Sequence, residues 1–212
     1  MLEGLRSASL GIVLIVLVGV GLVSQASAGV LAGNPNAYFD GTTTWTGSST
    51  FTQGTLVGYV DWAVFAPGQV PQSLLNSGYT PTPNELTYAY QVFETGAAPL
   101  STFSVALTNE ADNIGAFTAL SGGAPTSALL TALSSARWTF SGVVQGTSTE
   151  GVAFSSSQVP LSLFGVVVDT GQSQYVVPLP SPSAIAIPEP TSLLMAFGLT
   201  CGLSLARRRR GL

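Results

Sequence analysis

The 212-residue chain contains no histidine, no lysine and a single cysteine, Cys201. Its six basic residues are all arginines, at Arg6, Arg137 and 207–210. Residues 29–186 therefore lack the common general bases, the amines that form Schiff bases and the thiol nucleophiles. They also lack the nitrogen and sulfur ligands of most zinc sites. We therefore expect no enzymatic activity, no cofactor and no metal.

Charged residues make up only 8% of the chain, and basic charge is the scarcer kind. Between residues 29 and 186, eight acidic residues face one basic residue, Arg137, for a net charge of −7. Nucleic-acid binding depends on clustered arginine and lysine that neutralise phosphates. A nucleic-acid partner is therefore excluded. The acidic residues are Asp40, Asp61, Glu85, Glu94, Glu110, Asp112, Glu150 and Asp169.

The amino end has the pattern of an export signal. Arg6 lies in a short charged start, and an uninterrupted apolar run of 14 residues follows at 10–23. A membrane-spanning helix needs about 20 apolar residues, whereas the core of a signal peptide needs roughly 7 to 15. Ala26 and Ala28 place small side chains at the two positions that signal peptidase reads. We predict that residues 1–28 are a signal peptide, with an uncleaved anchor as the alternative.

The carboxyl end has the pattern of a short membrane helix. Residues 191–206 carry no charge, and these 16 residues would form a helix of roughly 24 Å, against a hydrocarbon core of about 30 Å. Such a mismatch costs little, and arginine side chains can reach the interface. Arginines beside a span stay in the cytoplasm, so the preceding chain is predicted to lie outside it. The predicted membrane stop consists of Arg207, Arg208, Arg209 and Arg210.

A stretch rich in proline and serine precedes this helix. Pro178, Pro180 and Pro182 predict an extended, non-helical linker over residues 178–187. The sequence Pro188-Glu189-Pro190 follows. Proline is tolerated in the first turn of a helix, and glutamate is favourable near its positive end. Taken alone, the tripeptide therefore indicates only the start of a helix.

The tripeptide, the apolar helix and the terminal arginines together resemble the PEP-CTERM sorting signal of exported bacterial proteins. The resemblance covers residues 188–212 and makes Pro188, Glu189 and Pro190 the sorting motif. It implies recognition by an exosortase, a membrane-embedded cysteine enzyme that cuts near the tripeptide. It also implies a place at the cell surface, in the extracellular matrix or in a biofilm. Cys201 is then an apolar residue of the span, because the catalytic cysteine belongs to the sorting enzyme.

Residues 29–177 are predicted to form an antiparallel β-sandwich, of the jelly-roll or Ig-like kind, between the signal helix and the transmembrane helix. Several windows alternate with a period of two, as half-buried strands do. Two runs, 56–65 and 161–168, are more continuously apolar, as central strands can be. Residues 127–136 fit a helix and a strand equally well. The predicted inward stripes are Phe103, Val105, Leu107; Leu86, Tyr88, Tyr90, Val92; and Trp138, Phe140, Gly142, Val144.

Aromatic residues are the candidates for binding sugars, because their rings can stack on them. Trp62 and Trp138 lie within apolar strand patterns and are expected in the core. Trp45 lies in a threonine-rich stretch, so it is the candidate sugar contact. Residues 109–113 gather oxygen-bearing side chains but lack the spacing of a calcium loop, so a solvated turn is expected there. The remaining aromatic candidates are Tyr38, Tyr59, Tyr79 and Tyr175.

Three functional hypotheses follow. The first is a non-enzymatic exported protein, processed by signal peptidase and exosortase, with a structural or adhesive domain at the cell surface or in the matrix. The second is a carbohydrate-binding module for exopolysaccharide, which predicts exposed aromatic rings on one sheet face. The third is a hydrolase that cleaves glycans with a pair of carboxylates. Spacing along the sequence identifies no such pair.

Overall fold

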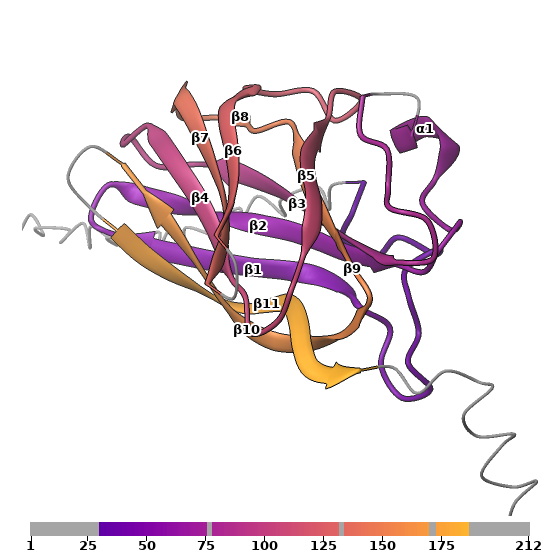
Figure 1. The fold of residues 1–212 in the computed structure, drawn as a ribbon. Coiled ribbons are helices and arrows are strands. Elements are labelled where there is room, and N and C mark those ends of the chain that lie inside the picture. The colour runs from indigo at the N-terminus through magenta and orange to yellow at the C-terminus, as the bar shows by residue number, and fades with distance from the viewer. Residues whose placement is uncertain (1–29, 76–77, 132–133, 170–172, 187–212) are drawn as a thin grey trace, which may run out of the picture.

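The computed structural model describes residues 30–75, 78–131, 134–169 and 173–186 (Figure 1). These residues form β-strands almost throughout, and the one helix among them is α1 (Gln72–Leu75). The strands are β1 (Thr46–Gln53), β2 (Leu56–Phe65), β3 (Leu86–Glu94), β4 (Leu100–Ala106), β5 (Asp112–Phe117), β6 (Pro125–Thr131), β7 (Ser135–Val143), β8 (Thr147–Ser148), β9 (Gly151–Ser156), β10 (Gln158–Val168) and β11 (Ser173–Ala186).

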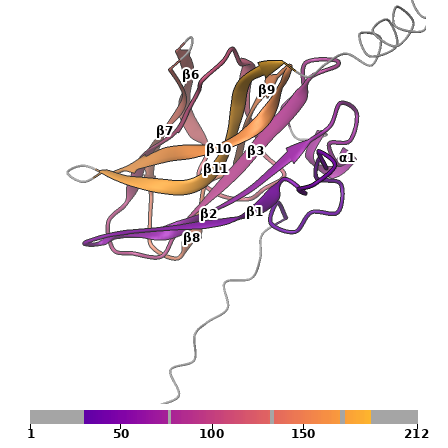
Figure 2. The same cartoon turned by 90° about the horizontal axis from the view of Figure 1, so that it is seen from below.

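The strands make two antiparallel sheets. Sheet I has the order β1-β2-β3-β9-β5, and the short β8 pairs with β3. Sheet II has the order β11-β10-β4-β7-β6. The chain crosses between the sheets after β3, β4, β5, β7 and β9, so each sheet combines strands distant in sequence (Figures 1 and 2). The predicted mainly β, antiparallel fold is confirmed.

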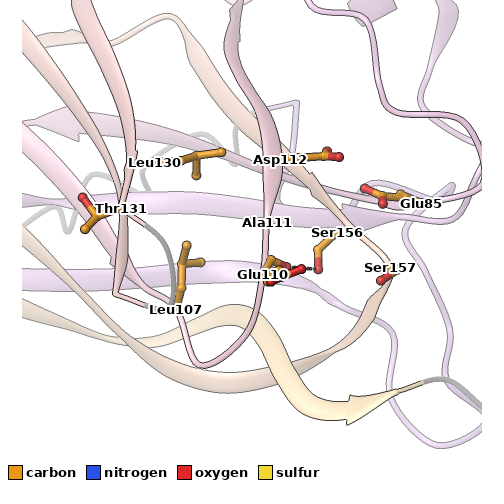
Figure 3. A pocket seen from close by; sticks show the side chains of 9 residues that line it. All are labelled: Glu85, Leu107, Glu110, Ala111, Asp112, Leu130, Thr131, Ser156 and Ser157. Atoms are coloured by element: carbon orange, nitrogen blue, oxygen red, sulfur yellow. Dashed lines mark hydrogen bonds between the residues drawn. The ribbon is translucent and has the colours of Figure 1, made fainter.

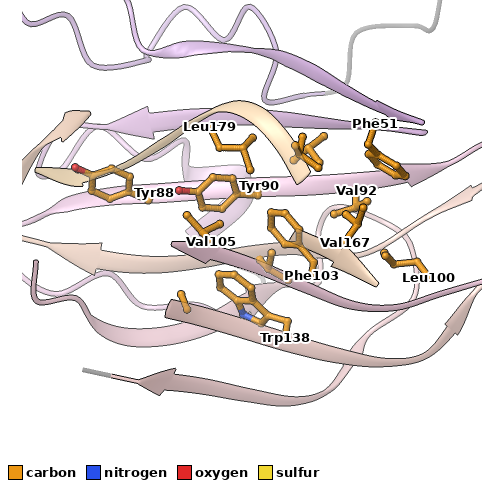
Figure 4. Close-up of a cluster of buried hydrophobic side chains, with 14 of the residues drawn as sticks. Phe51, Tyr88, Tyr90, Val92, Leu100, Phe103, Val105, Trp138, Val167 and Leu179 are labelled. Atoms are coloured by element: carbon orange, nitrogen blue, oxygen red, sulfur yellow. The ribbon is translucent and has the colours of Figure 1, made fainter. Parts of the chain in front are cut away.

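The principal core lies between the two sheets in a sandwich-like arrangement (Figure 4). The predicted stripe of β3 is buried throughout, and its partner stripe on β4 is buried as well. Trp138 of β7 stacks on Phe103 of β4 with 5.8 Å between ring centroids. Tyr90 of β3 lies 5.7 Å from Phe103, so aromatic rings from both sheets meet in the centre. Alternation along the strands explains these contacts, because every second side chain points inward.

A second, flanking cluster covers the outer side of one end of sheet I. Val64 points into the principal core, whereas its neighbour Phe65 packs in the flanking cluster. Leu31, Leu74 and Tyr79 supply much of the cover. This end of β2 is thus buried on both faces, which accounts for the continuously apolar run predicted at 56–65.

The predicted stripe on β7 is correct only in its first half. Trp138 and Phe140 are buried, but Gly142 is exposed and Val144 is 56% exposed. Gly142 has a φ of 105°, and the pairing of β7 with β4 shifts register before this point. The irregularity reverses the alternation, because one extra residue exchanges the two faces of a strand. Val143 therefore points inward in place of Val144.

The predicted linker at 178–187 is wrong for residues 178–186. They are extended, as expected, but they belong to β11 at the edge of sheet II. Tyr90 Oη donates a hydrogen bond of 2.5 Å to the Pro180 carbonyl, and Thr108 Oγ1 donates one of 2.6 Å to the Pro182 carbonyl. Proline is tolerated here because an edge strand can leave N–H positions unpaired. The repeated prolines thus mark an edge strand.

The ambiguous segment 127–136 belongs to two paired strands. Ser127 through Thr131 lie in β6, and Ser135 begins β7. The pairing of Leu129 with Arg137 and of Thr131 with Ser135 defines their register. Cross-strand pairing therefore decides a stretch for which local propensity was balanced.

Candidate functional site

The predicted processing sites lie outside the described residues. These are the signal peptidase positions Ala26 and Ala28, the sorting motif 188–190 and the membrane stop 207–210. The two predicted terminal helices also lie outside them. Among the residues that the structure does describe, no helix has the length and apolarity needed to cross a membrane.

Trp45, the candidate sugar contact, is half-buried against the principal core. Its indole Nε1 donates a 2.8 Å hydrogen bond to Asp40 Oδ2. Asp40 Oδ1 also accepts hydrogen bonds of 2.8 Å from the backbone N–H groups of Thr42 and Thr43. The Thr43 and Trp45 donors are the first causes that hold the pKa of Asp40 well below its usual range. Part of the Trp45 ring is thus committed to closing this turn.

The other tryptophans differ from each other. Trp138 is fully buried, as predicted. Trp62, also predicted for the core, is only half-buried. It packs over Gly47, where an added Cβ would come within 2.7 Å of the ring. Its Nε1 donates a 3.1 Å hydrogen bond to Ser49 Oγ. Trp62 therefore closes the side of the core, and Gly47 is small because the ring occupies its space.

A pocket of about 240 Å³ lies where the ends of β5, β6 and β9 approach one another (Figure 3). Three acidic residues line it, namely Glu85, Glu110 and Asp112. Leu107 and Leu130 provide apolar lining. Carboxylates and apolar groups drawn from distant parts of the chain thus share one concave surface, which makes this pocket the candidate functional site.

A tight turn positions Glu85 at the start of β3. Its backbone N–H donates a 3.3 Å hydrogen bond to the Thr82 carbonyl, closing the turn Thr82-Pro83-Asn84-Glu85. Asn84 has a φ of 65°, the conformation that a type II turn needs at its third position. Proline is favoured at the second position and asparagine is tolerated at the third. The local sequence therefore specifies the direction from which Glu85 enters the pocket.

Asp112 lies opposite, at the start of β5, where it pairs with Ser155 of β9. Thr82 Oγ1 donates a 2.7 Å hydrogen bond to Asp112 Oδ1. The Thr82 backbone N–H donates a 3.0 Å hydrogen bond to Ser155 Oγ, which also bonds Tyr79 Oη at 2.8 Å. This network holds the segment before β3 against β5 and β9. It brings the carboxyl groups of Glu85 and Asp112 together, although 26 residues lie between them (Figure 3).

The proximity of Asp112 changes the acidity of Glu85. Burial of the carboxyl, the nearby Asp112 charge and a hydrogen bond to the Asp112 side chain raise the pKa of Glu85 to about 7. Glu85 Oε2 is buried and has no other hydrogen-bond partner among the described residues. A proton on Glu85 relieves the repulsion and supplies a donor to Asp112. The pair can therefore take up or release a proton near neutral pH.

This geometry bears on two of the predicted alternatives. Glycosidases place two carboxyl groups about 5 to 9.5 Å apart, on either side of the bond to be cut. Glu85 and Asp112 instead share a hydrogen bond, which leaves no room for a sugar linkage between them. Within the described ranges, no group of three or more acidic or other ligating residues could hold a metal ion. The pair is better suited to holding the turn against the sheet.

Comparison with known proteins adds no relative: no family model, no curated protein and no solved structure matches this chain. The functional argument therefore depends on the sequence motifs and on the geometry described above.

The Glu85 and Asp112 pair was not found from the sequence. Each residue was counted among scattered acids, since spacing along the chain gave no reason to join them. One local signal was present, namely the Pro83-Asn84 turn immediately before Glu85. It identifies a constrained approach but not the partner, because β5 and β3 are held on opposite sides of β9.

Proposed function

We propose that this chain is an exported, non-enzymatic protein with a structural or adhesive domain, cut by signal peptidase at its amino end and by an exosortase at its carboxyl end. The proposal combines the sequence patterns of both ends with one structural observation. Leu31 is fully buried, and the last strand, β11, ends at Ala186. The predicted cleavage positions, before Gly29 and near 188–190, therefore fall immediately outside the folded part.

This placement matters for processing. Cleavage inside β11 would remove Leu179 and Pro180 from the core, whereas cleavage near the tripeptide leaves the described strands complete. The domain can then keep its fold after losing both ends. We propose the cell surface or extracellular matrix as its location, and the finer class of the fold, jelly-roll or Ig-like, stays part of the proposal.

Intact-mass analysis of the protein from the outer fraction of cells with a working exosortase tests this function. The expected species begins at Gly29 and lacks Arg207, Arg208, Arg209 and Arg210. A matched strain carrying Glu189→Ala in the tripeptide should retain the arginines. Recovery of the unaltered chain from wild-type cells, with both ends present, would contradict the proposal.

A further inference from the structure

The outer face of sheet II differs in charge from the rest of the described structure. The five strands of this sheet contain no aspartate or glutamate, and their one charged residue is Arg137 of β7. Every acidic residue in the described ranges lies on sheet I or in a connecting segment. Arg137 is exposed and makes no ion pair with another described residue. This face therefore offers an uncompensated positive charge on an otherwise acidic domain.

Strand pairing aligns Arg137 with an exposed aromatic residue. The registers join five residues in one row across all five strands. Arg137 and Tyr175 lie three strand spacings apart in this row, a distance of about 14 Å. The row runs Leu129, Arg137, Ser104, Val166 and Tyr175.

Tyr175 forms half of an exposed aromatic corner. It is 63% exposed, and Phe164 of β10 is 41% exposed. Their ring centroids are 5.2 Å apart and the rings are nearly perpendicular, at 88°. The contact holds both rings in place and still leaves much of their surface in solvent. Large exposed rings fixed on a strand face can provide a preformed stacking surface at little entropic cost.

Hydroxyl groups occupy the neighbouring row. Ser127 pairs with Thr139, Thr139 with Thr102, and Val168 with Ser173. Ser127 and Ser173 are exposed, and Thr102 and Thr139 are half-buried. A ligand lying across the strands would therefore meet hydrogen-bonding groups beside the aromatic corner and the arginine.

We infer that the outer face of sheet II binds an acidic polysaccharide, with a sugar ring against Phe164 and Tyr175 and a carboxylate of the same polymer on Arg137. The guanidinium group matches a carboxylate geometrically and electrostatically. A protein partner fits less well, because protein interfaces concentrate their apolar anchors in one centre. Here Arg137 and Ser104 separate Leu129 from the aromatic corner. The inference deepens the adhesive role proposed above by naming its ligand class.

The test measures binding of the full chain, purified in mild detergent, to polygalacturonate oligosaccharides and to uncharged dextran oligosaccharides. Wild-type protein should bind polygalacturonate more tightly, and added salt should reduce the difference. Tyr175→Ala should weaken binding to polygalacturonate about tenfold, as loss of an aromatic anchor does. Arg137→Gln should remove the preference for polygalacturonate while leaving the dextran affinity unchanged.

Phe39→Ala is the matched control, because Phe39 is 58% exposed but lies outside sheet II. It should bind as the wild type does. Thermal unfolding checks that each variant is folded, which its exposed position favours. No binding of polygalacturonate, or binding that Tyr175→Ala leaves intact, would overturn the inference. A dimer that Tyr175→Ala converts to monomer in sedimentation experiments would assign the face to a second copy instead. These results do not depend on processing, so they are separable from the mass analysis.

Discussion

The carboxyl pair in the pocket gives the sharpest prediction for stability. Replacing Glu85 by glutamine keeps the shape of the side chain and its ability to donate to Asp112, but removes its ionisation. Wild-type Glu85 has a pKa raised from 4.5 to about 7 by burial and by Asp112. A raised pKa means that its stabilising contribution is complete below pH 4.5 and is lost as the pH rises through about 7. Glu85→Gln should not show this loss.

The magnitude follows from the shift. Taken in full, a change from 4.5 to about 7 corresponds to about 3 kcal/mol. Glu85 is partly exposed, and solvent screens its interaction with Asp112, so we expect about 1 to 2 kcal/mol. Between pH 4.5 and pH 8, the wild type should therefore lose about 1 to 2 kcal/mol of unfolding free energy relative to Glu85→Gln.

Urea unfolding of the two proteins at several pH values measures this difference directly. Glu110→Gln is the control, since Glu110 lines the same pocket but is exposed. It should follow the wild-type pH profile. If the wild type and Glu85→Gln kept a constant difference over this pH range, the assignment of a shared proton to Glu85 and Asp112 would be refuted.

The remaining predictions concern the fold. Tyr90→Phe leaves the buried Pro180 carbonyl without its donor, so urea unfolding should show a loss of about 1 to 3 kcal/mol. A chain ending after Ala186 should unfold at nearly the temperature of the full chain, whereas one ending after Val177 should be protease-sensitive; equal resistance would contradict the role of β11. Asn84→Ala should cost about 1 to 2 kcal/mol at its positive φ, and Asn84→Gly much less; equal losses in urea unfolding would contradict the turn. Trp138→Ala should cost about 3 to 5 kcal/mol, against a small change for the exposed Leu129→Ala.

The sequence predicted the strands of the core well, because their signal is local. Alternation in β3 and β4 states directly which side chains point inward, and each of those side chains is buried. The prediction failed where one residue changed the alternation. Gly142 reverses the faces at the end of β7, and no periodic pattern can show that reversal in advance.

The prolines at 178–182 illustrate a different limit. Proline indicates extended backbone and a missing N–H donor, and both a linker and an edge strand satisfy these conditions. The distinction depends on partners such as Tyr90 and Thr108, which are at least 70 residues away along the chain. Burial of Leu179 decided it in favour of the strand.

By itself, the sequence determined the antiparallel β class, the buried stripes and the acidic character of residues 29–186, because composition and a period of two are properties of neighbouring residues. It also supplied the predicted processing motifs. The tertiary structure alone decided that Glu85 meets Asp112 and that Arg137 shares a row with Tyr175. Sheet order sets these pairs, and sheet order depends on contacts between distant segments that no local pattern contains.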